Sequence, residues 1–400
     1  MIPKRRRWLL VWSLCICALI WMPMTADAFT PIKLKPGIPV KPIRLIPFGE
    51  QLWSKQVGQG NETAPAIGPD GTVYMHVVLG FLVAYNPDGT VKWTQSGFSY
   101  ITSITVRPDD GTVYVTDDYK LYAYTPARSL KWSISLPYST PPLLGRDGTI
   151  YVVTNLGERS TLQAVTPSGK IKGHLDLDQT SSTVGGAIGT DGTIYLGGNH
   201  GTLYAVSPQT TVTITVPSIG HLPAKIITRL TPIPHLKWKT ILGGGYASLA
   251  FDPNGTLYAV SNDHHLYKVN PSTGAAAVLF TGNGMFTNTP AIGADHTIYA
   301  AASDRFYALN PNGAVKWSYQ THGTVTTSAT LDAMGKVYFG SNDNYLYVLY
   351  TDGTVLWKYK TGGTILHTPV IDPVRPVDWQ PIYIVSDDGK LYAVRAPGSA

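Results

Sequence analysis

Cysteine is almost absent from this 400-residue chain, which holds only Cys15 and Cys17. Both lie close to the N-terminus, so the rest of the chain has no thiol and can form no disulfide. This excludes a disulfide scaffold and leaves stability to the hydrophobic core, for which a chain of this length is ample. The residues before Cys15, Trp-Ser-Leu, do not match a lipoprotein acceptor site, where small residues should precede the cysteine.

Charged residues are also scarce, at 14% of the sequence, and the formal net charge is +6. Residues 1–28 hold four of the 31 basic residues and one of the 25 acidic ones, so the remainder has 27 basic and 24 acidic residues, or +3. Most of the apparent basicity therefore belongs to the N-terminal segment. No basic run remains beyond it, which argues against a nucleic-acid partner.

A long hydrophobic run is missing as well. The apolar stretch from Trp8 to Trp21 is too short for a comfortable membrane span. It follows the basic residues 4–7 and precedes Ala26-Asp27-Ala28, a small-x-small cleavage pattern. We interpret residues 1–28 as a secretory signal peptide, with an uncleaved anchor as the alternative. The mature chain is then expected to have no transmembrane span and to be secreted, at the cell surface or otherwise extracytoplasmic.

Glycine (40), proline (30) and tyrosine (24) are abundant instead, which favours an all-β fold with many turns. One pattern recurs eight times: an apolar pair, a turn with glycine and then Thr-(Val/Ile/Leu)-Tyr, as in "AIGPDGTVYM" at 66–75. A second strand such as "LYAV" follows each copy, and a tryptophan closes most of them. These tryptophans are Trp53, Trp93, Trp132, Trp238, Trp317 and Trp357. Two copies have Gly173 and Leu279 at that place.

The repeat has a period of about 40 residues, which with strands and turns indicates a propeller blade. We predict an eight-bladed β-propeller with four-stranded antiparallel blades, whose strands we name A to D in chain order. Each such sheet is too small to bury both faces alone, and stacking in a ring buries them. The repeats begin with a lone D strand at 50–56 and end with a C strand at 390–394. We expect the N-terminal strand to complete the last blade, which hides two sheet edges.

The propeller domain is predicted to span residues 51–395. Residues 29–50 contain five prolines and are expected to form an extended arm or linker. Residues 209–235 are an insertion in blade 4, between strands C and D. Val212, Ile214 and Val216 alternate there, which suggests a protruding hairpin. The insertion is either an element that contacts a partner or a tolerated enlargement of a loop.

The stretch "PAIGPDGTVY…LVAYNPDGTVKW" resembles the pyrroloquinoline-quinone-like (PQQ-like) propeller repeat, and the resemblance covers residues 51–395. The resemblance implies two branches. Enzymes of the family hold the quinone beside calcium, with an aspartate base and often a disulfide of adjacent cysteines. This chain has no cysteine beyond Cys17, and its A strands, such as "PAIG" and "SATL", carry packing residues rather than calcium ligands. It is more similar to the binding branch, which includes the propeller lipoprotein of the outer-membrane β-barrel assembly machinery. We therefore expect neither PQQ nor calcium.

The D-to-A loops vary in sequence while the strands do not, and such loops line one mouth of a propeller channel. An aromatic and amide rim suits a peptide or a glycan, although simple loop variation is the alternative. The candidate ligand or partner residues are Asn61, Tyr100, Tyr138, Ser182, Tyr246, Asn288, Thr327 and His367.

Other residues are interpreted structurally. The repeated tryptophans are expected to pack between blades. Acidic and amide pairs recur between strands B and C, for example Asp117-Asp118 and Asn342-Asp343. Each blade has only one pair, so we assign them to turn hydrogen bonds rather than to calcium. His264 and His265 are adjacent, and the remaining histidines show no paired spacing, so no metal site is predicted.

These observations favour an exported, non-catalytic propeller that serves as a protein-interaction or cell-envelope binding scaffold. We expect a monomer whose partner is a protein or another component of the envelope. Two alternatives stay open: a PQQ-dependent dehydrogenase with a degenerate site, and an extracellular glycan-binding propeller.

Overall fold

A computed structural model describes residues 49–59, 63–156, 159–177, 183–216, 225–231, 234–375 and 380–395. They belong to one compact unit, Pro47–Ala400. The described part of this unit consists of strands, turns and loops, with no helix. Residues 29–48 of the proline-rich segment lie outside the described residues.

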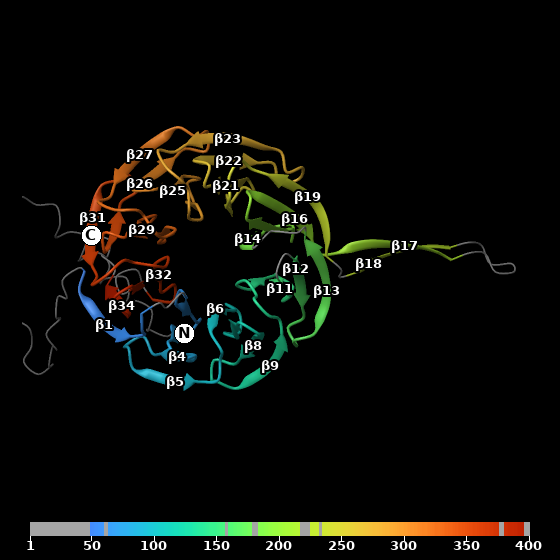
Figure 1. Ribbon diagram of the computed structural model, residues 1–400, viewed down its shortest axis with the longest axis horizontal. Coiled ribbons are helices and arrows are strands. Elements are labelled where there is room, and N and C mark those ends of the chain that lie inside the picture. Colours follow the sequence, from blue (N-terminus) through green and yellow to red (C-terminus); the bar gives the residue numbers. More distant parts are fainter. Residues whose placement is uncertain are drawn as a thin grey trace, which may run out of the picture. The chain divides into compact units, whose positions relative to one another are not determined.

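Eight four-stranded sheets follow one another around a ring (Figure 1). The first four blades are β2 (Ala66–Ile67), β3 (Val73–Val77), β4 (Phe81–Tyr85) and β5 (Val91–Gln95); β6 (Ile101–Val106), β7 (Val113–Asp117), β8 (Lys120–Tyr124) and β9 (Leu130–Ser135); β10 (Leu143–Leu144), β11 (Ile150–Leu156), β12 (Arg159–Val165) and β13 (Ile171–Leu177); and β14 (Thr183–Ile188), β15 (Ile194–Gly198), β16 (Thr202–Ser207) and β19 (His235–Ile241).

The last four blades are β20 (Ala247–Phe251), β21 (Leu257–Ser261), β22 (His265–Val269) and β23 (Ala276–Thr281); β24 (Ala291–Ile292), β25 (Ile298–Ala302), β26 (Arg305–Leu309) and β27 (Val315–Gln320); β28 (Thr330–Leu331), β29 (Val337–Gly340), β30 (Tyr345–Leu349) and β31 (Val355–Lys360); and β32 (Val370–Ile371), β33 (Pro381–Ser386), β34 (Lys390–Arg395) and β1 (Gln51–Gln56). The predicted eight-bladed propeller is confirmed.

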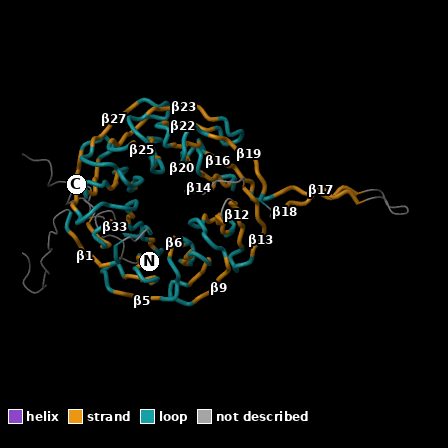
Figure 2. Tube along the Cα trace, in the orientation of Figure 1, coloured by secondary structure: helices purple, strands orange, loops and turns teal. Residues whose placement is uncertain are grey.

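Within a blade, the strands run antiparallel in the order A, B, C, D, and the D strands lie on the outer margin (Figure 2). The B and C strands are buried nearly throughout, as in β3 and β4. The D strands alternate between exposed and half-buried residues, as in β9 and β27. This gradient explains the sequence, because strands packed on both faces read as continuous apolar runs and outer strands alternate.

The ring is closed by its two ends, as predicted. Strand β1 pairs antiparallel with β34, with Trp53 opposite Ala393 and Lys55 opposite Leu391. The strand that comes first in the sequence is thus the fourth strand of the last blade. This pairing covers the outer edge of β34, and an open edge is prone to aggregation.

The hydrophobic core consists of layers between neighbouring blades rather than of one central core. One layer joins Val73 and Met75 of the first blade to Tyr383 and Leu391 of the last. Layers of the same kind lie between the other neighbours. Each blade therefore depends on its neighbours to bury its apolar faces.

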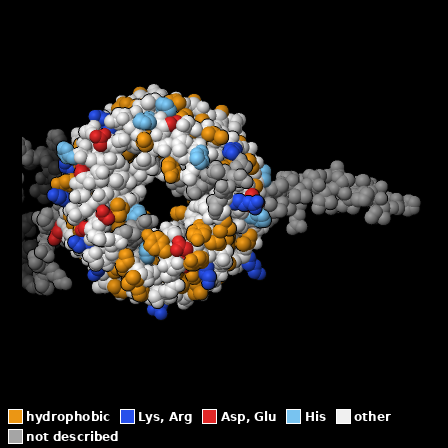
Figure 3. Space-filling view, viewed as in Figure 1, with side chains coloured by type: hydrophobic (Ala, Val, Ile, Leu, Met, Phe, Trp, Pro, Cys, Tyr) orange, Lys and Arg blue, Asp and Glu red, His pale blue; other side chains and the backbone are white. Residues whose placement is uncertain are grey.

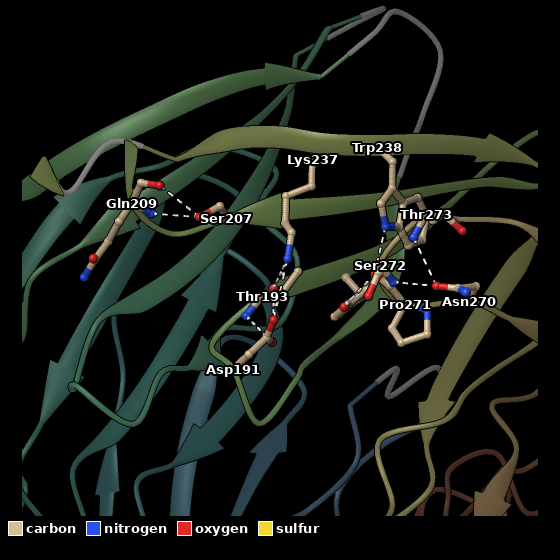
Figure 4. Close-up of polar contacts among 11 residues, drawn as sticks. Asp191, Thr193, Ser207, Gln209, Lys237, Trp238, Asn270, Pro271, Ser272 and Thr273 are labelled. Carbon is tan, nitrogen blue, oxygen red and sulfur yellow. Dashed lines mark hydrogen bonds and ion pairs between the residues drawn. The ribbon is translucent and has the colours of Figure 1, made fainter. Parts of the chain in front are cut away.

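The six repeated tryptophans join neighbouring blades at the outer margin. Five of them donate an indole Nε1 hydrogen bond to a carbonyl in the C-to-D turn of the next blade. The pairs are Trp53 with Pro87 (2.9 Å), Trp93 with Pro126 (2.9 Å), Trp132 with Pro167 (2.8 Å), Trp238 with Pro271 (2.8 Å; Figure 4) and Trp317 with Thr351 (2.7 Å). The backbone of Gly49 lies against the ring of the sixth, Trp357.

The insertion in blade 4 forms a hairpin of β17 (Thr210–Val216) and β18 (Lys225–Thr231), as the alternation suggested. It lies between β16 and β19 in the sequence and projects from the outer margin of the ring (Figure 1).

Candidate functional site

The antiparallel blades give the ring two chemically different ends. Because strands A and C run one way and B and D the other, the D-to-A loops share one end with the B-to-C turns. We call this end the D–A face. Hydrogen bonds confirm the arrangement: the amide of Ser99, in a D-to-A loop, donates to Asp117 Oδ2 in a B-to-C turn at 3.2 Å. The amides of Gly245 and Tyr246 likewise donate to Asn262 Oδ1.

The acidic residues of the B-to-C turns hold this face together. Asp117 accepts hydrogen bonds from the amides of Tyr119 (2.9 Å) and Lys120 (2.8 Å) and from the hydroxyl of Tyr122 (3.2 Å). Burial, together with the negative charge of Asp117, raises the pKa of Tyr122 to about 12, so its hydroxyl remains a donor. The same arrangement recurs at three other B-to-C turns, where an aspartate carboxylate accepts hydrogen bonds from a backbone amide and from the hydroxyl of a tyrosine in the C strand. These turns contain Asp263, Asp343 and Asp388.

Large apolar side chains stand exposed on the D–A face of the first three blades. Leu79 is 89% exposed, Tyr119 is 56%, Tyr138 is 55% and Leu156 is 55%. We call these four residues the apolar arc. Leu79 and Tyr119 lie in B-to-C turns, Leu156 is the last residue of the B strand β11, and Tyr138 lies in a D-to-A loop. On the face seen in Figure 3, hydrophobic side chains gather over the sector of the ring that holds β6 and β9.

Backbone contacts link the loops that carry the apolar arc. The amide of Tyr138 donates to the carbonyl of Asp118 (2.9 Å), next to Tyr119, and the amide of Asn155, next to Leu156, donates to the carbonyl of Tyr138 (3.2 Å). The loop that follows the first blade extends this connection to Leu79, since Gly80 lies against Phe98 and the hydroxyl of Ser99 donates to Asp118.

Tyr138 lies at the middle of the apolar arc in a strained conformation. Its φ is +50°, in the left-handed region that non-glycine residues rarely adopt. The amide and carbonyl of Tyr138 are both bound by neighbouring turns, which fix the backbone there. Strain held by surrounding structure at an exposed aromatic residue is typical of a binding surface.

A cavity of about 450 Å³ opens between the D-to-A loops that enter the fifth and sixth blades. Its walls are mainly apolar, and its lining includes Tyr246, Val260, Asn262, Met285 and Phe286. Tyr246 and Met285 are about half exposed. We call it the rim pocket. It has the size of a small ligand site and would fit a large apolar side chain.

The predicted site residues fall into different environments. Asn61 and Ser182 lie outside the described residues. Tyr138 belongs to the apolar arc, and Tyr246 lines the rim pocket. The ring of Tyr100 packs edge-on against buried His76, with centroids 5.4 Å apart, and burial lowers the pKa of that histidine. His367 is half-buried in the loop before the last blade.

Two of the predicted residues support the loops. The side-chain amide of Asn288 donates to the carbonyl of Val325 (3.1 Å), which joins two D-to-A loops. Thr327 is only 2% exposed, and its hydroxyl accepts from the amide of Gly340 (2.8 Å) and donates to the carbonyl of Ser328 (2.9 Å). The described candidates thus share one end of the ring without forming one cluster.

The sequence interpretation missed the B-to-C turns. Leu79 and Tyr119 occupy turn positions in the first two blades, where later blades carry polar residues such as Asp304 and Asp343, and Leu156 ends the B strand of the third blade. An apolar residue in a tight turn has no local structural reason, so this contrast was a usable signal.

The opposite end of the ring, which holds the A-to-B and C-to-D turns, carries a repeated polar motif. In the fourth blade, Asp191 accepts hydrogen bonds from the amide and hydroxyl of Thr193, and Lys237 lies 3.5 Å from the carboxylate (Figure 4). Burial tends to raise the pKa of Asp191, but these hydrogen bonds and the ammonium group outweigh it and lower the pKa. The matching aspartates are Asp70, Asp110, Asp147 and Asp295.

Metal-ligating side chains are dispersed. Within the described ranges, no three residues among His, Cys, Asp and Glu come together in a way that could hold an ion. The carboxylates of the B-to-C and A-to-B turns are already used by turn amides, threonines and tyrosines.

No helix of the part that the structure describes is long and apolar enough to cross a membrane.

The fold, with its Gly-turn and Leu-Tyr-Ala strands, defines an eight-bladed propeller of the PQQ-like class. The chain matches the family described as outer membrane protein assembly factor BamB over residues 47–214 and 229–399. Because this match spans most of the sequence, the chain belongs to that family. No curated protein resembles it closely enough to count as a match.

Three solved structures show the same fold. BamB from Moraxella catarrhalis is 16% identical, with a TM-score of 0.64, over 87% of this chain and 99% of that one. The quinohemoprotein alcohol dehydrogenase ADHIIG from Pseudomonas putida HK5 is 12% identical, with a TM-score of 0.62, over 88% and 77%. The computationally designed Ika8 protein is 13% identical, with a TM-score of 0.64, over 87% and 98%. An assembly factor, an enzyme and a designed protein share this ring, so the fold alone does not decide the function.

Proposed function

We propose that this chain is an exported, non-catalytic accessory factor in outer-membrane protein assembly, and that it binds a protein partner through the apolar arc. The family supports the assembly role. The observation that carries the binding site is the exposure of four large apolar side chains on linked loops, namely Leu79, Tyr119, Tyr138 and Leu156.

Four large apolar side chains held in water on adjacent loops are unfavourable unless another surface covers them. Tyrosine also combines a large apolar ring with a polar hydroxyl, which is why it is enriched in protein interfaces. Polar groups such as Asp118 lie between the members of the arc. An apolar centre with polar neighbours is the usual composition of a protein–protein contact.

We further propose that the chain acts without PQQ, calcium or another cofactor. Two features support this: the dispersed metal-ligating side chains of the described residues and the absence of cysteine after Cys17. Purified protein mixed with PQQ and calcium should show no saturable absorbance change and no dye reduction with alcohols or sugars. Saturable quinone binding with turnover would contradict this part of the proposal and favour a dehydrogenase.

Export is proposed from residues 1–28 together with the family. N-terminal sequencing of protein from the cell envelope should begin at Phe29. Protein recovered from the cytoplasm with residues 1–28 intact would contradict it.

The binding site is tested by photo-crosslinking in the exporting cell. A photo-reactive amino acid at Tyr138 should give a discrete crosslinked protein band. The matched control is Tyr350, which is exposed in a C-to-D turn at the other end of the ring. A crosslinker there should give no such band. Identification of the band by mass spectrometry then names the partner.

A double variant, Tyr119→Ser with Tyr138→Ser, should lose the co-purified partner while keeping the unfolding midpoint of the parent, because both rings are exposed. Tyr350→Ser should keep the partner. Retention of the partner by the double variant, or equal crosslinking from Tyr350, would rule out the apolar arc as the binding site.

A further inference from the structure

The hairpin β17–β18 is a two-stranded sheet of its own. Its ladder runs from the pair Thr210–Thr231 to the pair Val216–Lys225 without a register shift. Its base is fixed to the fourth blade. The hydroxyl of Ser207 donates to the carbonyl of Gln209 (2.9 Å; Figure 4). Ser207 also pairs with His235 across β16 and β19.

Within the described ranges, neither β17 nor β18 pairs with any third strand. A lone two-stranded hairpin is marginally stable in water, and at least three strands or a packed face are usually needed. The hairpin nevertheless projects from the outer margin of the ring (Figure 1). Its two strand edges are therefore unused hydrogen-bonding surfaces.

The two edges differ in chemistry. All residues of β17, "TTVTITV", are β-branched and none is charged. Strand β18, "KIITRLT", carries Lys225 and Arg229. Charged residues on an edge strand discourage pairing with another chain, whereas β-branched residues favour the extended conformation. Only β17 presents an edge without such protection.

The sequence of β17 is also self-complementary. If two copies pair antiparallel about Thr213, Thr213 meets its own counterpart. Val212 then lies opposite Ile214, and Thr211 lies opposite Thr215. No pair brings two charges together, and like residue types meet at the centre, which is favourable for cross-strand contacts.

We propose that β17 is a dimerisation edge: it pairs with β17 of a second copy of this chain about a two-fold axis at Thr213. The product is a four-stranded sheet in the order β18, β17, β17 and β18, with the charged strands outside. A closed two-fold pairing consumes the unprotected edge of both copies at once. It differs from the monomer that the sequence suggested.

This proposal is independent of the proposed function. The hairpin interrupts a C-to-D connection and so starts from the end of the ring opposite the D–A face, which leaves the apolar arc accessible in a dimer. The family match omits residues 215–228, whereas most of β17 lies within the matched residues.

Sedimentation equilibrium of the protein as purified after export tests the dimer. The contact is small, so we expect dissociation in the micromolar range. Thr213→Lys places like charges directly opposite each other at the two-fold axis and should weaken dimerisation at least tenfold, as should Thr213→Glu. An equimolar mixture of the two variants should restore the dimer, because opposite charges then meet.

The matched control is Thr228→Lys, which adds the same charge to the residue opposite Thr213 on the protected strand β18. It should leave the dimer intact. A second variant that replaces residues 209–234 with a short turn should be monomeric, with an unchanged unfolding midpoint for the ring. A parent protein that stays monomeric up to about 0.1 mM, or Thr213 variants that dimerise as the parent does, would overturn the proposal.

Discussion

The indole Nε1 of Trp53 donates a hydrogen bond to the carbonyl oxygen of Pro87, 2.9 Å away. Trp53 lies on β1, which completes the last blade, and Pro87 lies in the C-to-D turn of the first blade. The ring of Trp53 also contacts the rings of Tyr85 and Tyr383, whose centroids are 6.0 and 5.7 Å from that of Trp53. One side chain therefore joins the first strand in the sequence to the blades on both sides of the point of closure.

Trp53→Ala should lower the free energy of unfolding by about 3 kcal/mol, because it removes a half-buried ring at the closure. Urea unfolding followed by tyrosine and tryptophan fluorescence measures this. Trp53→Phe keeps an aromatic ring and loses only the N–H donor, so it should cost about 1 kcal/mol. A change below about 0.5 kcal/mol for Trp53→Ala would mean that the tryptophan does not hold the ring closed.

Arg128 occupies a turn position that other blades give to glycine. Its φ is +75°, while Gly169 and Gly353 adopt +81° and +86° at the matching place below a tryptophan. Arg128→Gly should therefore raise the free energy of unfolding by about 0.5 kcal/mol. Relief of the left-handed strain stabilises the folded state. Two smaller effects oppose it: the greater entropy of the unfolded chain with glycine, and the loss of the 3.3 Å hydrogen bond from Arg128 to the carbonyl of Thr94.

The reverse change, Gly169→Ala, serves as the control for Arg128→Gly. A Cβ atom at Gly169 would lie 2.5 Å from the ring of Trp132, so this variant should be destabilised by more than about 1 kcal/mol. Chemical denaturation of both variants measures the contrast. A loss of stability in Arg128→Gly would mean that the arginine contacts outweigh the backbone strain.

The fold could be predicted because each blade repeats the same local rules. Thr72-Val73-Tyr74 and its counterparts mark the B strand, and the spacing of Trp53 and Trp93 gives the period. Even the closure by β1 followed from counting strands, since a lone D strand at one end and a missing one at the other leave a single simple solution.

The candidate site was harder to predict because surface exposure depends on how loops meet. Tyr138 was expected from the D-to-A loop, but Leu79, Tyr119 and Leu156 come from different blades, and only the ring places them on one face. Thr327 has a surface-like sequence context, yet its side chain is buried and its hydroxyl makes hydrogen bonds with Ser328 and with Gly340 of β29. Loop residues lack the periodicity that allows strands to be predicted from sequence.

The aspartates of the A-to-B turns should make stability depend on acid pH. Burial alone would raise the pKa of Asp295, but hydrogen bonds from Thr297 and Lys316 outweigh it and hold the pKa below its ordinary value of 3.8. A carboxyl group with a lowered pKa in the folded state contributes stability that is fully present above about pH 4. That contribution is lost as the pH falls through the folded-state pKa.

Lys316→Met tests this dependence. The variant should be less stable than the parent by less than about 1 kcal/mol near pH 7, because the pair is partly exposed to solvent. The difference should persist down to about pH 4 and shrink below it, as Asp295 becomes protonated in both proteins. Thermal unfolding between pH 7 and pH 2.5 measures the difference.

The control for Lys316→Met is Lys268→Met. Lys268 is exposed on β22 and forms no ion pair with the described residues. Its replacement should give a difference that does not change with pH over the same range. A pH-independent difference for Lys316→Met as well would show that the lysine acts through packing rather than through the carboxylate.

Gly185 and Gly186 line a small void between the third and fourth blades, but the space around their Cα atoms differs. The void has a volume of about 160 Å³ and is lined by Leu143, Tyr151, Leu196 and both glycines. A Cβ atom at Gly185 would meet nothing within 4 Å, whereas one at Gly186 would lie 2.7 Å from the carbonyl of Tyr195.

Gly185→Ala should therefore stabilise the protein by up to about 1 kcal/mol, because it restricts the unfolded chain without a clash. Gly186→Ala should destabilise it, since a backbone carbonyl cannot move without disturbing the ladder between β14 and β15. Urea midpoints of the two variants, measured side by side, should thus shift in opposite directions, and shifts of the same sign would contradict the packing described between these blades.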